Sequence, residues 1–179
     1  FDTKGANVTS DPYFGKKIAG GCYVSGEGSY IEHIGNHYYL FMSYGGLEPN
    51  GGYEMRVFRS SRPDGPYKDM NGTDAIFTSW KLNYGPNADN RGEKLLGAYN
   101  HWGFMNVGER AQGHNSVFAA EDGRTYLVYH TKFNDGTAGH QVRVHQLFLN
   151  RSGWPVAAPF EFHGETTGDR QIASSQRRF

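Results

Sequence analysis

Apolar positions along the chain gather into short runs of aromatic and branched residues that are separated by glycine-containing turns. Three such runs occupy residues 26–31, 38–43 and 52–57, and residues 141–145 alternate polar and apolar side chains. Short runs bounded by turn residues are typical of β-strands. The glycine and asparagine at 35–36 suit a tight hairpin between the first two runs. The pattern therefore predicts a chain built from antiparallel strands.

The three runs occur a second time, at residues 113–118, 125–130 and 139–144, with a constant shift of 87 positions (113 − 26). The second copy turns at residues 121–123, a Glu-Asp-Gly sequence that also favours a hairpin. One gap-free shift that holds over three strands predicts a structural repeat. Seven pairs are identical across it: Gly26 and Gly113, Ser29 and Ser116, Tyr39 and Tyr126, Leu40 and Leu127, Gly52 and Gly139, Arg56 and Arg143, Val57 and Val144.

A fourth strand is expected after each copy, at residues 63–67 and 153–156. Four antiparallel strands form one blade of a β-propeller, and a blade takes about 40 to 50 residues. The shift therefore leaves room for a further blade around residues 74–102. We expect an all-β fold, a partial β-propeller with about three blades in this chain. Three blades do not close a ring, so further blades are expected outside it.

Composition and charge narrow the function. The aromatic content of 15% and the 25 glycines favour an all-β chain, and 18 basic residues balance 18 acidic ones. Without a basic stripe, no nucleic-acid partner is expected. The apolar runs are far shorter than the roughly 20 residues of a membrane helix, so no membrane partner is expected either. Cys22 is the single cysteine, which excludes an internal disulfide, and we interpret it as a small buried residue.

The first strand of each blade is the functional place in a propeller, because it lines the central channel. The constant shift puts Glu27 and His114 at the same position of their blades, each directly after a glycine. Taken alone, Glu27 fits a solvated turn and His114 fits a hydrogen-bonded structural role. Convergence at the axis favours a shared pocket for both side chains instead.

Three segments carry a resemblance to a known family. Residues 26–31 (GEGSYI) and 35–44 (GNHYYLFMSY) resemble the acid-bearing blade of glycoside hydrolase family 43. Residues 112–117 (QGHNSV) with 122–130 (DGRTYLVYH) resemble its later histidine-bearing blade, and residues 153–159 (GWPVAAP) resemble the ending of its arabinanase branch. The resemblance covers roughly residues 20–165.

The resemblance implies a five-bladed propeller and an inverting mechanism, with Glu27 at the position of the general acid. The catalytic base and a pKa-modulating group, both aspartates in the family, belong to earlier blades, so Asp2 and Asp11 receive no role. The resemblance also implies that a separate N-terminal fragment or chain supplies those blades. Residues 1–165 are assigned to the C-terminal blades, and residues 166–179 are expected to be a tail or linker towards a possible C-terminal β domain.

Further site residues follow from the same resemblance. His114 matches an axial histidine that helps to hold a calcium ion, largely through waters. Arg143 and His130 match positions near the acid and the substrate, although Arg56, the repeat partner of Arg143, leaves a packing role open. Side-chain chemistry, rather than the resemblance, brings in Asn100 and Trp102, for which we weigh a sugar-stacking surface against simple packing.

The expected substrate is α-1,5-linked L-arabinan or its oligosaccharides. Two alternatives remain at this point: a non-catalytic sugar-binding propeller, and a family member that acts as a β-xylosidase or α-L-arabinofuranosidase. A polymeric plant substrate implies an extracellular or periplasmic location. Endo or exo action depends on loops that the sequence does not place.

Overall fold

The computed structural model describes residues 10–11, 15–97 and 106–164, and every regular element in this part of the chain is a β-strand. The described residues contain no helix long and apolar enough to span a membrane. The described ranges form ten strands: β1 (Ser10–Asp11), β2 (Gly15–Lys16), β3 (Glu27–Ile34), β4 (His37–Tyr44), β5 (Glu54–Ser60), β6 (Glu93–Gly97), β7 (Glu109–Ala119), β8 (Thr125–Phe133), β9 (Gln141–Leu149) and β10 (Pro155–Ala157).

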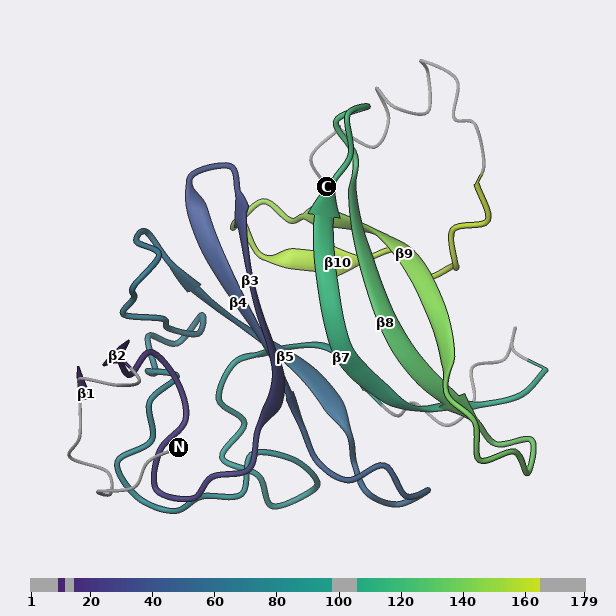
Figure 1. Ribbon diagram of the computed structural model, residues 1–179, viewed down its shortest axis with the longest axis horizontal. Coiled ribbons are helices and arrows are strands. Elements are labelled where there is room, and N and C mark those ends of the chain that lie inside the picture. The colour runs from purple at the N-terminus through teal and green to yellow at the C-terminus, as the bar shows by residue number, and fades with distance from the viewer. Residues whose placement is uncertain (1–9, 12–14, 98–105, 165–179) are drawn as a thin grey trace.

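Two four-stranded antiparallel sheets lie side by side (Figure 1), with the orders β3-β4-β5-β6 and β7-β8-β9-β10. Strands β1 and β2 pair separately. In both sheets the first strand along the chain is an edge strand, and these two edges, β3 and β7, contact each other. This arrangement is that of neighbouring propeller blades with their first strands innermost. The predicted fold class, an all-β partial propeller, is confirmed.

The main core lies between the two sheets because each presents one apolar face to the other. Strands β4 and β5 contribute one half of this core and strands β7, β8 and β9 the other. The sheets are also joined at the rim, where Tyr39 Oη donates a hydrogen bond to the carbonyl of Gly153 at 2.5 Å and Arg59 stacks over the Trp154 ring. The core residues are Tyr39, Phe41, Met55, Val57, Val117, Leu127, Tyr129 and Leu147.

The other face of the first sheet is covered by irregular segments of this chain. Tyr67 and Ala75 pack against Leu40, Met42 and Phe58, and these loops lie on the far side of the first sheet from the second sheet (Figure 1). A second apolar core therefore forms without a further sheet.

Two sequence-based expectations are corrected by the strand pairing. The fourth strand of the first sheet is β6, at residues 93–97, whereas residues 63–67 contain a turn at 63–64 and no strand. The expected third blade around residues 74–102 is not formed by the described part of that stretch, because residues 93–97 pair with β5 instead. The segment before β6 is irregular because its apolar side chains cover one sheet face rather than alternate. In the second sheet, β10 confirms the fourth strand expected at residues 153–156.

The hairpin turns between β3 and β4 and between β7 and β8 have the predicted chemistry. Gly35 and Gly123 adopt φ angles of +63° and +81°, and an added Cβ at either position would meet no atom within 4 Å. Both turns are therefore open to solvent, and the first lies at the end of β3 opposite Glu27.

Candidate active site

The two inner strands, β3 and β7, have irregular pairing next to Glu27 and His114, the two residues that the sequence repeat makes equivalent. The pairing of β3 with β4 shifts between Glu27 and Tyr30, and that of β7 with β8 shifts between Gly113 and Ser116. Each irregularity contains a left-handed residue, Gly28 at φ +57° and His114 at φ +52°. A bulge re-aims the side chains beside it, and a non-glycine residue in this conformation is held there by its surroundings.

Two glycines allow the sheets to approach closely at this point. A Cβ on Gly28 would lie 2.9 Å from His114 Cα. A Cβ on Gly113 would overlap the ring of Tyr53 and lie 2.8 Å from Ser43 Oγ. The backbone N–H of His114 donates a hydrogen bond of 2.8 Å to that same Ser43 oxygen. Strand β7 is therefore fixed directly on the ends of β3 and β4.

Glu27 is exposed and has one defined partner. Tyr53 Oη donates a hydrogen bond to Glu27 Oε1 at 2.6 Å. The Tyr53 side chain is only 1% exposed, and its burial together with the nearby Glu27 carboxylate raises the pKa of its phenol. Tyr53 therefore keeps its proton and acts as a donor to the carboxylate.

Three histidines surround this pair. His130 stacks on Tyr53 with 5.8 Å between ring centroids, and it lies 6.0 Å from His114 and 4.5 Å from His140. Burial, and then the neighbouring His140 and His114, lower the pKa of His130, and its Nδ1 is buried without a hydrogen-bond partner. The structure thus gathers Glu27, Ser43, Tyr53, His114, His130 and His140 in one place, which we call the Glu27 cluster.

Arg143 lies elsewhere, on the opposite face of the second sheet from His130. Val142 pairs with His130, and Arg143 pairs with Tyr129. Successive side chains of a strand point to opposite faces, so Arg143 shares the face of Tyr129 rather than that of His130. The structure therefore does not bring Arg143 together with the Glu27 cluster.

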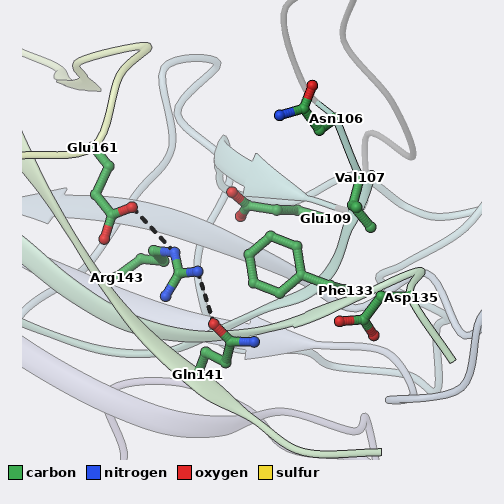
Figure 2. Close-up of a pocket in the computed structure, with 8 residues that line it drawn as sticks. All are labelled: Asn106, Val107, Glu109, Phe133, Asp135, Gln141, Arg143 and Glu161. Atoms are coloured by element: carbon green, nitrogen blue, oxygen red, sulfur yellow. Dashed lines mark hydrogen bonds and ion pairs between the residues drawn. The ribbon is translucent and has the colours of Figure 1, made fainter. Parts of the chain in front are cut away.

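Arg143 instead lines a groove of about 380 Å³ at the start of β7 and β9 (Figure 2). Its guanidinium lies between Glu161 and Gln141, at 3.1 Å from Glu161 Oε2 and 2.8 Å from Gln141 Oε1, and 4.8 Å above the centre of the Phe133 ring. The other lining residues are Asn106, Val107, Glu109 and Asp135.

Asn100 and Trp102 lie outside the described residues. Within the described part, sequence reasoning missed Tyr53, Ser43 and His140. The repeat itself contained the signal, because the shift that relates Glu27 to His114 also relates Ser43 to His130 and Tyr53 to His140. The three pairs of side chains related by the shift all lie at the contact between the two sheets.

A calcium ion is not accommodated by the described residues alone. No group of three His, Cys, Asp or Glu side chains among them could hold a metal ion. His114 offers a nitrogen, whereas calcium prefers oxygen ligands. The predicted water-mediated role of His114 thus remains a prediction.

Chemically, the Glu27 cluster offers one carboxyl group, that of Glu27, which accepts a hydrogen bond from the buried Tyr53 hydroxyl. Such a group can protonate a leaving oxygen. Glycoside hydrolysis with inversion needs a second carboxylate about 6.5–9.5 Å away to activate water. Glu27 is the single carboxyl group of the cluster as defined, so the cluster is half of such a site.

Several known proteins resemble this chain in sequence. A family model described as "Glycosyl hydrolases family 43" matches residues 4–155. The extracellular endo-α-(1→5)-L-arabinanase 2 of Bacillus subtilis is 44% identical over 166 residues, which cover 86% of this chain and 34% of that protein. The chain thus spans about a third of the length of the curated relatives it matches.

Solved structures show the same relationship. The endo-1,5-α-L-arabinanase of Thermotoga petrophila superimposes with a TM-score of 0.73 and 36% identity, covering 91% of this chain and 40% of that one. The α-L-arabinanase of Cellvibrio cellulosa complexed with arabinohexaose superimposes with a TM-score of 0.58 and 26% identity, covering 74% of this chain and 36% of that one.

Proposed function

Because the chain belongs to glycosyl hydrolase family 43, we propose that it is part of an inverting glycosidase that cleaves α-1,5-linked L-arabinan or its oligosaccharides. The observation that supports this most is the place of Glu27, which lies at the innermost strand of its sheet, beside the neighbouring sheet and against a buried tyrosine hydroxyl. The names of the similar proteins support arabinan as the substrate.

Glu27 acts as the general acid in this proposal. It gives its proton to the glycosidic oxygen while a water molecule attacks the anomeric carbon from the other side of the sugar. A carboxylate base accepts the proton of that water from a distance of about 6.5–9.5 Å. We place this base, and an aspartate that modulates the acid, on N-terminal blades supplied by a separate fragment or chain.

The setting of the enzyme is also a proposal. Relatives named as extracellular support a secreted protein that meets its polymer outside the cell. We also place a calcium ion near His114, with waters as most of its ligands, and no step above depends on it. Isothermal titration of the complete assembly with CaCl₂ tests this ion, and a His114→Ala variant that binds calcium as well as the unchanged protein contradicts the assignment.

The central test compares variants of two glutamates in the same strand. The N-terminal blades and this chain are combined and supplied with linear arabinan. Glu27→Gln removes the acid and is expected to lower kcat about 10²- to 10⁴-fold, because general acid catalysis contributes that much. Glu32→Gln serves as the control. It removes another carboxylate from β3, one that accepts a hydrogen bond from Tyr30 rather than from Tyr53.

Four outcomes bear on the proposal. Proton NMR of the first product should show an inverted anomeric configuration, whereas retention contradicts the mechanism. Binding of arabinan without hydrolysis by the assembly would favour a sugar-binding propeller, and preferential cleavage of a β-xyloside would favour the xylosidase alternative. This chain without the N-terminal blades is expected to be inactive.

A further inference from the structure

The hydroxyl of Tyr53 lies between Glu27 and a hydrogen bond that joins the two sheets. The backbone N–H of His114 in β7 donates to Ser43 Oγ in β4, at 2.8 Å. The Ser43 hydroxyl lies beside Tyr53, where it opposes the rise in the Tyr53 pKa, and Tyr53 Oη donates to Glu27 Oε1, at 2.6 Å. Ser43 is fully buried and Tyr53 is 1% exposed, so water does not compete with these bonds.

The direction of this series is fixed at its start. A backbone N–H can only donate, so Ser43 Oγ must accept from His114. The single hydroxyl hydrogen of Ser43 is then free for Tyr53 Oη, and the single hydroxyl hydrogen of Tyr53 is directed at Glu27. Glu27 Oε1 is thereby always an acceptor in this arrangement.

We propose that Tyr53 is a positioning residue that keeps Glu27 Oε1 as a hydrogen-bond acceptor, so that the catalytic proton is carried by Glu27 Oε2. This inference rests on the proposed function, in which Glu27 is the general acid. In the reaction, the Oε2–H bond breaks and its proton moves to the glycosidic oxygen, which also receives the electrons of the breaking bond to the anomeric carbon. Oε1 keeps its hydrogen bond throughout.

Packing prevents Tyr53 from turning away. Its ring lies against Gly113, where even a methyl group would overlap it, and it stacks on His130 at an interplanar angle of 21°. The ring is thus held from two sides by the neighbouring sheet. A fixed donor in a protected site orients the acid at no further entropic cost during the reaction.

The experiment uses the complete assembly and two substrates that differ in their need for an acid. The first is an arabino-oligosaccharide, whose sugar leaving group must be protonated. The second carries 2,4-dinitrophenolate at the scissile bond, which departs without a proton. Tyr53→Phe is expected to lower kcat/KM about 10- to 100-fold on the oligosaccharide, because misplacement of a reacting group has effects of that size. Its kcat/KM on the dinitrophenyl substrate should change less than about threefold, since no proton transfer is then required.

Tyr67→Phe is the matched control, because Tyr67 is equally buried and its hydroxyl bonds only a backbone carbonyl in the described structure, that of Pro63. It should leave both substrates unaffected. If Tyr53→Phe does not fold, Ser43→Ala tests the residue that precedes Tyr53 in the series. It should likewise lower kcat/KM more on the oligosaccharide than on the dinitrophenyl substrate.

Equal losses on the two substrates would assign Tyr53 a purely structural role and overturn the inference, as would unchanged cleavage of the oligosaccharide by Tyr53→Phe. Failure of the unchanged assembly to cleave either substrate would instead contradict the proposed function itself. The two failures are therefore distinguishable.

Discussion

Two arginines at equivalent positions of the two sheets have opposite surroundings. Arg56 and Arg143 each bond the side chain two residues earlier, Glu54 at 2.6 Å and Gln141 at 2.8 Å. The Arg56 and Glu54 side chains are both 6% exposed, whereas Arg143 and its ion-pair partner Glu161 are 22% and 30% exposed. The same local pattern thus yields a closed network in one sheet and an open groove in the other.

The fourth strands explain the difference. Strand β6 pairs with residues 54–57, so the chain before it closes over Arg56, where Asn90 Oδ1 and the Gly92 carbonyl accept hydrogen bonds from the guanidinium. Strand β10 pairs only with residues 147–149, at the other end of β9. The start of β9 therefore remains uncovered by a fourth strand. A sequence repeat fixes a residue's position in its strand, but what covers that residue depends on the connecting segments.

The largest effect is expected from removing each arginine. Arg56→Met leaves the Glu54 carboxylate buried, with the Lys94 ammonium as its one remaining ion-pair partner among the described residues, and should lower the free energy of unfolding by about 3–5 kcal/mol. Arg143→Met breaks a partly exposed pair and should lower it by about 1 kcal/mol or less. Urea unfolding of both variants measures the two values, and equal losses would break the comparison.

A smaller effect is expected from exchanging the partners. Glu54→Gln gives the first sheet the neutral partner of the second, and should lower the free energy of unfolding by about 2 kcal/mol, because a buried guanidinium loses its charged partner while keeping an acceptor. Gln141→Glu should change it by no more than about 0.5 kcal/mol in the open groove. A reversal of this order in thermal unfolding would contradict the explanation by burial.

The equivalent glycines before β5 and β9 differ in backbone conformation, which extends the comparison of the two sheets from side chains to the main chain. Gly52 has a φ angle of +66°, so Gly52→Ala should lower the free energy of unfolding by about 1–2 kcal/mol. Gly139 has an ordinary φ angle and no atom within 4 Å of an added Cβ, so Gly139→Ala should be neutral within about 0.5 kcal/mol. Differential scanning calorimetry of the pair checks both values, and a destabilising Gly139→Ala would count against the structure there.

The smallest effect concerns salt. A double-mutant cycle on Arg143 and Glu161 should give a coupling energy of about 0.2–1 kcal/mol that falls in 1 M NaCl, because partly exposed ion pairs are screened. The same cycle on Arg56 and Glu54 should depend little on salt. A salt-resistant coupling at Arg143 would show that the groove is closed in solution.

The sequence predicted the features that depend on local patterns. The alternating runs and hairpin turns gave the six central strands, and the constant shift placed Glu27 and His114 on inner strands that meet. It could not place β6, because residues 61–92 have no strand periodicity and gain their stability by covering a sheet face. The face of Arg143 depended on its pairing with Tyr129, and this cross-strand register is set by tertiary packing.

The open hairpin turn at Gly35 has a practical consequence. Strand β3 runs from Glu27 to Ile34, so this turn stands about 23 Å from Glu27 along an extended strand. A dye, a purification handle or a solid support attached there would leave the Glu27 cluster unobstructed. The hairpin is thus a natural anchor for immobilising this protein on a polysaccharide-processing surface.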